Sequence, residues 1–121
     1  MITLENNRMT FRFREVRPDA ECSIEFQRTL RIPDDDRSYP LPPGLGRFPL
    51  RHVDDFANRL SGKTLNRGGV VMPMHQAEAM WLNFDSGYSA YPCAVKVCAV
   101  SGEPWSDRLD PDPQNYLVIP D

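Results

Sequence analysis

A histidine and a glutamate three positions apart form the pattern in this sequence that most resembles a reactive site. On a helix, His75 and Glu78 would share one face, as two ligands of a carboxylate-rich metal site do. A usable site needs a third or fourth ligand, and His52 is the only other histidine. We therefore predict no metal and no cofactor, and we interpret the pair as a partly exposed histidine beside a solvated glutamate.

A cysteine offers a second chemistry with the same histidine. Cys93 and His75 can form a thiolate–imidazolium pair, with Asp85 or Glu78 orienting the imidazole. However, Pro92 before the cysteine and a predicted strand after it match no known nucleophile turn. A small buried thiol is the simpler interpretation. A small enzyme that uses His75, Glu78 and Cys93 is kept as the alternative hypothesis.

Basic and aromatic side chains supply the candidate binding residues. Arg12 and Arg14 alternate on one face of a predicted strand, and Arg31 extends that face from the next strand. Such a face can bind an anion or a protein, although salt bridges to neighbouring glutamates explain it more simply. The full set of candidate binding residues is Arg12, Arg14, Arg31, Tyr39, Trp81 and Trp105.

Residues 33–50 are expected to form a proline-rich strap. Five prolines and two glycines in this stretch leave little scope for helix or strand. Residues 37–43 match the RxxPxxP spacing that SH3-type grooves bind, but a chain with 12 prolines produces such matches by chance. We predict an extended segment across the core. Its predicted anchors are Leu41, Leu45, Phe48 and Leu50.

Alternating hydrophobicity predicts strands in both halves of the chain. Two runs, over residues 9–14 and 22–32, alternate apolar and polar side chains as a hairpin with one wet face does. Residues 1–8 are polar, and we expect them to be loose. The other predicted elements are a helix over 53–60 ended by Gly62, a strand over 69–72, a helical turn leading into a strand over 76–84, a central strand over 91–100 and a last strand over 116–119.

These elements predict a single α+β domain, mainly β, over residues 1–121. We expect a small antiparallel sheet or a partly closed barrel, with one short helix and long proline-rich connections. Residues 68–98 hold two valine-rich runs, one of the two tryptophans and two of the three cysteines, so we expect them to form the centre of the core.

Composition narrows the partners and the compartment. The net charge is −3 and no Lys/Arg run occurs, which argues against general nucleic-acid binding. No apolar run is long enough to span a membrane, and the N-terminus lacks the apolar region of a secretory signal. Three cysteines without CxxC spacing argue against a disulfide framework. We therefore expect a cytoplasmic protein with reduced thiols, bound neither to nucleic acid nor to membrane.

A resemblance is carried by four runs: GRFPLRHVDDFA, GGVVMPMHQAEAMWLNF, YPCAVKV and VSGEPW. Through them the sequence resembles a family of uncharacterised bacterial proteins over most of residues 28–120. Members of that family are longer at the C-terminus and carry a few more residues before the Ser101 turn. The resemblance therefore implies a bacterial short form or N-terminal portion of such a protein. It implies no activity and no catalytic residues.

The absence of a complete catalytic set favours binding over catalysis. We predict a non-catalytic protein-binding or structural module, because much of the chain is extended and offers strand edges to a partner. The expected partner is another protein or the remainder of a longer chain, and self-association is compatible with the same features. A second alternative is an acidic regulator or inhibitor that acts through residues 103–112.

Overall fold

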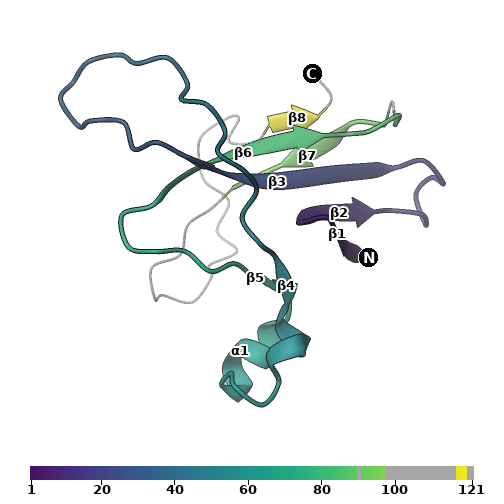
Figure 1. Ribbon diagram of the computed structural model, residues 1–121. Coiled ribbons are helices and arrows are strands. Elements are labelled where there is room, and N and C mark those ends of the chain that lie inside the picture. Colours follow the sequence, from purple (N-terminus) through teal and green to yellow (C-terminus); the bar gives the residue numbers. More distant parts are fainter. Residues whose placement is uncertain (90, 98–116, 120–121) are drawn as a thin grey trace, which may run out of the picture.

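Antiparallel strands make up most of the computed structural model, which describes residues 1–89, 91–97 and 117–119 (Figure 1). Its largest sheet has four strands in the order β1-β2-β3-β6. The bounds are Ile2–Glu5 for β1, Arg8–Arg12 for β2, Glu21–Thr29 for β3 and Ala79–Asp85 for β6. The mainly β prediction with antiparallel pairing is therefore confirmed. The strands in the described ranges form open sheets and no closed barrel.

The N-terminal strand corrects the expectation of a loose segment over residues 1–8. β1 pairs with β2 along its whole length, ending with Glu5 opposite Arg8. The two residues between them, Asn6 and Asn7, have φ values of 50° and 59°. A two-residue hairpin loop needs positive φ at both positions, and asparagine tolerates it better than most residues. The Asn-Asn pair is therefore the turn signal that joins these strands.

The register gives the four-stranded sheet two chemically different faces. On the polar face, Ser23 of β3 lies opposite Thr10 of β2 and Asp85 of β6. On the apolar face, Ile24 lies opposite Met9 and Phe84. Because side chains alternate along each strand, this register separates the two sets over the whole sheet. Residues on the polar face include Arg8, Arg12, Glu25, Gln27 and Trp81; residues on the apolar face include Phe11, Cys22, Phe26 and Leu82.

The strap joins the edge of β3 beyond the end of β2. The Arg28 backbone N–H donates to the Gly46 carbonyl at 2.8 Å, and the Leu45 N–H donates to the Arg28 carbonyl at 2.8 Å. Phe48 is fully buried beneath the Arg28 guanidinium, whose centre lies 4.7 Å from the ring centroid. Leu50 is also buried. Phe48 and Leu50 thus anchor the strap as predicted, whereas Leu41 and Leu45 are exposed.

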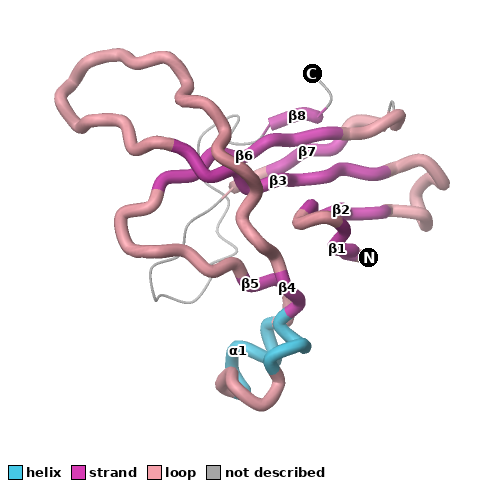
Figure 2. Tube along the Cα trace, in the orientation of Figure 1, coloured by secondary structure: helices cyan, strands magenta, loops and turns pink. Residues whose placement is uncertain are grey.

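A small helical unit follows the strap and corrects the predicted helix over 53–60. β4 (Arg51–His52) leads into a 3-10 helix, η1 (Val53–Phe56), and then α1 (Gly62–Arg67) leads to β5 (Val70–Val71). Gly62 therefore begins a helix and does not end one. The Ser61 side chain accepts from the Thr64 N–H at 3.4 Å, which makes Ser61 the N-cap. Figure 2 shows these helices together at one end of the molecule.

A third pair of strands corrects the expectation of a central strand over 91–100. β7 (Cys93–Val95) pairs with β8 (Leu117–Ile119), while the centre of the main sheet is β3, between β2 and β6. The last predicted strand is confirmed as β8. Positions 98–100 lie outside the described residues. Among the described residues, the buried hydrophobic ones also differ from the expected core over 68–98: they are Ala20, Cys22, Ile24, Phe48, Leu50 and Val53.

Candidate functional site

His75 and Glu78 form the ends of a turn and do not lie on a helix. The Glu78 N–H donates to the His75 carbonyl at 3.1 Å, and the His75 N–H donates to Glu78 Oε2 at 2.9 Å. The other oxygen of Glu78, Oε1, accepts from Arg28 Nε at 3.2 Å. The carboxylate is therefore engaged within the chain, and His75 is exposed. This turn leads into β6 where a helical turn was expected.

Cys93 lies at the other end of the sheet from this turn. It lines a cavity together with Cys22, near the start of β3, whereas Glu78 contacts Arg28 near the end of β3. Arg28 lies six positions after Cys22 along the extended strand, about 20 Å at 3.3 Å per residue. The structure therefore does not bring Cys93 together with His75 and Glu78. Within residues 1–89, 91–97 and 117–119, no group of three His, Cys, Asp or Glu side chains is placed to hold a metal ion.

The polar face of the sheet carries a buried carboxylate between two arginines. Glu25 is 4% exposed, and its Oε1 lies 2.8 Å from Arg8 Nε and 2.8 Å from Arg47 Nη2. Gln27 Nε2 donates to the other oxygen at 3.2 Å. Burial alone would raise the pKa of Glu25, but hydrogen bonds from Arg8 and Gln27 and the charge of Arg47 outweigh it, so the pKa lies below its ordinary value.

Two of the predicted arginines differ in their surroundings. Arg12 lies on the polar face, where its Nη1 donates to Thr3 Oγ1 at 2.6 Å and its Nε lies 3.4 Å from Glu21 Oε2. The simpler interpretation of Arg12, a salt bridge within the sheet, agrees with this geometry. Arg14 lies beyond β2 and is exposed.

A long loop leaves the sheet at the end of β3 and returns at the strap. Figure 1 shows it as the blue loop that extends furthest from the strands. We call residues 30–45 the arm. All of them except Pro42 are exposed. The arm holds two predicted binding residues, Arg31 and Tyr39. The Tyr39 hydroxyl donates to Asp35 Oδ2 at 2.5 Å, and this hydrogen bond raises the pKa of the tyrosine.

The remaining predicted aromatic residues have separate outcomes. Trp81 lies on the polar face opposite Gln27, next to Gly44 at the base of the arm. Its Nε1 is buried, and no described residue accepts a hydrogen bond from it. Trp81 is half-buried and contacts the base of the arm at Gly44, and its role in binding stays a prediction. Trp105 and the acidic stretch 103–112 lie outside the described residues.

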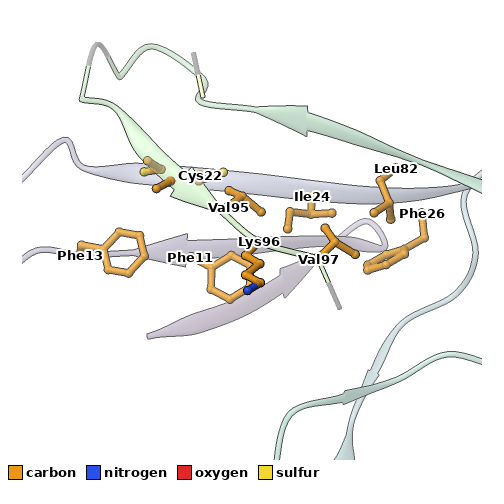
Figure 3. Close-up of a pocket in the computed structure, with 11 residues that line it drawn as sticks. Phe11, Phe13, Cys22, Ile24, Phe26, Leu82, Val95, Lys96 and Val97 are labelled. Atoms are coloured by element: carbon orange, nitrogen blue, oxygen red, sulfur yellow. The ribbon is translucent and has the colours of Figure 1, made fainter. Parts of the chain in front are cut away.

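An apolar cavity of about 430 Å³ lies between the apolar face of the sheet and β7 (Figure 3). Its walls are mainly phenylalanine and aliphatic side chains: Phe11, Phe13, Ile24, Phe26, Leu82 and Val95. Cys22 and Cys93 also line it, and so does Lys96. Burial is the main reason that the pKa of Cys22 is raised, with a smaller contribution from Cys93. Of these residues the sequence singled out only Cys93, as a candidate nucleophile beside His75 and Glu78, and it predicted no apolar site here.

One sequence signal could have located the cavity. Phe11, Phe13, Cys22, Ile24 and Phe26 form a wide apolar face on two adjacent strands, and the sequence predicts no long helix to cover it. A short strand such as β7 covers such a face only in part. The aromatic residues that border an uncovered gap are therefore candidates for ligand contact.

Comparison of the chain with family models, curated proteins and solved structures finds no match. The resemblance to bacterial proteins over residues 28–120 thus stays a prediction. Within the described residues, no helix is long and apolar enough to cross a membrane. The function must therefore be argued from the residues of this chain.

Proposed function

We propose that this chain is a non-catalytic protein-interaction module and that the arm, residues 30–45, docks onto another protein. The observation that supports this most is the exposure of large apolar side chains along the arm. Leu41 is 71% exposed, Leu30 59% and Leu45 58%. Ile32 and Tyr39 are also exposed. Several large apolar side chains exposed within one short segment are a feature of protein–protein contact sites.

The base of the arm is held in place, which favours binding. Two backbone hydrogen bonds join Arg28 to Leu45 and Gly46, and the Thr29 hydroxyl donates to the Pro43 carbonyl at 3.1 Å. Four prolines further restrict the backbone between residues 33 and 43. A segment restricted in this way loses less conformational entropy when it binds.

The charges of the arm indicate the chemistry of the partner. Asp34 and Asp36 are exposed and form no ion pair with any residue in the described ranges. They flank Asp35, which accepts from Tyr39 and from the Arg37 N–H. Arg31 and Arg37 are exposed in the same segment. The expected partner surface is therefore an apolar groove for the leucines, bordered by basic side chains that face the aspartates and by acidic ones that face these two arginines.

Leu41→Asp tests the proposal by placing a charge at the most exposed apolar position of the arm. The matched control is Val16→Asp, because Val16 is also aliphatic, is 58% exposed and lies in the turn between β2 and β3. Affinity purification from lysate of the source organism, with quantitative mass spectrometry, measures the partner retained by each variant. We expect Leu41→Asp to retain roughly tenfold less of a stoichiometric partner than the wild type does, because it removes an interface anchor.

The control separates docking from general surface effects. Val16→Asp should retain the partner at the wild-type level, and both variants should keep the wild-type circular dichroism spectrum. Equal retention by wild type, Leu41→Asp and Val16→Asp would contradict the role of the arm. Sedimentation tests for a second copy: if the wild type forms a concentration-dependent dimer that Leu41→Asp abolishes, the partner of the arm is another copy of this chain.

A further inference from the structure

The apolar cavity is open to solvent on one side, so its volume describes a surface pocket and not an internal void. At about 430 Å³, this cavity lies within the range of small-molecule sites, roughly 300–1,000 Å³. Phe13 is 37% exposed and Val97 60% exposed, so the cavity reaches the protein surface at these residues. A ligand from solution can therefore enter it.

The walls of the cavity select for an apolar ligand. Phe11, Phe26 and Leu82 contribute rings and a branched aliphatic chain, and Ile24 is buried beneath them in β3. Among the residues that the structure describes, no aspartate, glutamate or arginine lines the cavity. Water beside such apolar walls finds no hydrogen-bond partners there, whereas a hydrocarbon chain gains van der Waals contacts with them.

Lys96 is the one charged side chain among the described residues that line the cavity. It follows β7, and Figure 3 shows its side chain beside the phenylalanine side of the cavity with the amino nitrogen at its end. The residue is exposed, and its amino group forms no ion pair with the part of the chain that the structure describes. A lysine in this position can lay its methylene stem along apolar walls and keep its charge at the water boundary.

We propose that this cavity is a binding site for an amphipathic carboxylate, a ligand with one aliphatic chain and one anionic head group. The chain packs against Phe11, Phe26 and Leu82, and the carboxylate pairs with Lys96 at the surface. Apolar contact supplies most of the affinity, since hydrocarbon burial scales with area. The lysine selects the anionic head group over a neutral one. This site shares no residue with the arm, so it is independent of protein docking.

The probes are decanoate and 1-decanol, which share a ten-carbon chain and differ in the charge of the head group. Isothermal titration calorimetry with the full chain should show saturable one-to-one binding of decanoate. Lys96→Met keeps an unbranched stem that ends at Cε and removes the charged amino group. We expect this variant to weaken decanoate binding roughly fivefold, the upper range for an exposed charge pair, and to leave 1-decanol binding unchanged. The matched control is Lys63→Met in α1, which should leave both unchanged.

The position of the ligand is tested on the unaltered protein by methyl NMR. Decanoate should shift the methyl resonances of Ile24, Leu82 and Val95, which line the cavity, and not those of Leu50 and Val53, which are buried elsewhere. Absence of saturable decanoate binding would overturn the proposal. So would shifts confined to residues outside the cavity. Equal effects of Lys96→Met and Lys63→Met would overturn the role assigned to Lys96 and, with it, the carboxylate head group.

Discussion

On the polar face of the sheet Glu25 lies between Arg8 and Arg47, whereas on the apolar face Lys96 has no ion-pair partner among the described residues. The Thr10 and Ser23 hydroxyls on the polar face also pair with each other, at 2.9 Å. The polar face thus satisfies its buried carboxylate and hydroxyl groups within the chain, although Trp81 Nε1 has no acceptor among the described residues. The apolar face keeps a cavity and a charge that no described residue pairs with. Groups that are already satisfied stabilise a fold, and unsatisfied surface is where a ligand gains most.

The largest effect that separates the faces is expected at Phe48. Phe48→Ala removes a fully buried ring from the apolar side and should lower the free energy of unfolding by about 3–5 kcal/mol. Phe13→Ala, at a ring 37% exposed beside the cavity, should cost about 1 kcal/mol or less. Urea titration followed by circular dichroism measures both. Similar losses would show that the rim of the cavity is as much a part of the core as Phe48.

The second effect concerns the buried carboxylate of the polar face. Glu25→Gln should lower the free energy of unfolding by roughly 2 kcal/mol at pH 7. This is less than the roughly 3–5 kcal/mol for a fully buried ion pair, because the side chains of Arg8 and Arg47 are about one-third exposed and can rehydrate. The control is Glu15→Gln, at an exposed glutamate in the turn after β2, which should have little effect.

The pH dependence of that effect has a definite sign. The pKa of Glu25 is lower in the folded protein, so its ionised form stabilises the fold fully above the unfolded value, roughly 4.3. That contribution is lost as the pH falls through the folded pKa. The difference between wild type and Glu25→Gln should therefore shrink in urea titrations below about pH 4. A difference that stays constant down to pH 2.5 would contradict the assigned shift.

A smaller effect tests how closely the strap packs on the polar face. A Cβ at Gly44 would lie 2.9 Å from Gln27 Oε1 and 3.1 Å from Trp81 Cζ2. Gly44→Ala should therefore lower the free energy of unfolding by about 1–2 kcal/mol. Gly62→Ala is the matched control, since it meets nothing within 4 Å and lies in α1, where alanine is the better helix former. Chemical denaturation should show opposite signs for the two variants.

The smallest effect concerns chemical reactivity: the rates at which two thiols on the apolar side, Cys22 and Cys93, react with a reagent. Burial raises the pKa of Cys22, which is 3% exposed, whereas Cys93 is half-buried. In a Cys98→Ser background, Cys93 should react with Ellman's reagent faster than Cys22 at pH 8, because the thiolate is the reactive form. Cys22→Ser and Cys93→Ser variants assign the two phases. Faster reaction of Cys22 would mean that β7 does not cover it.

Local patterns predicted most of the strands but few of their neighbours. The alternation over residues 22–32 gives β3, and the short apolar run at Val70 gives β5. Which strand is central depends on long-range pairing of β3 with β6, and periodicity within either strand carries no such information. The helix predicted over 53–60 differs from α1 because Val53 and Phe56 fit a helical stripe but form only a 3-10 helix. Ser61 and Thr64 form the cap that begins α1.

The candidate sites were harder to predict than the strands. The spacing of His75 and Glu78 suggests a shared site, but the Glu78 carboxylate pairs with Arg28, a residue 50 positions away. The prolines predict a strap over the core, whereas the hydrogen bonds to β3 and the buried anchors lie within the segment from Leu45 to Leu50. The cavity depends on how little of an apolar face β7 covers. That quantity is tertiary and leaves only an indirect trace in the sequence.

The order of strands in the main sheet also governs how the chain folds. β1, β2 and β3 are neighbours in sequence, and the Arg8–Glu25 contact spans 17 positions, whereas the Arg28–Glu78 contact that accompanies β6 spans 50. Pairing of distant segments is slow because the connecting chain must be closed first. The three-stranded meander should therefore form early, and docking of β6 should set the rate. Closure entropy grows only logarithmically with loop length, so an arm of this size slows folding little.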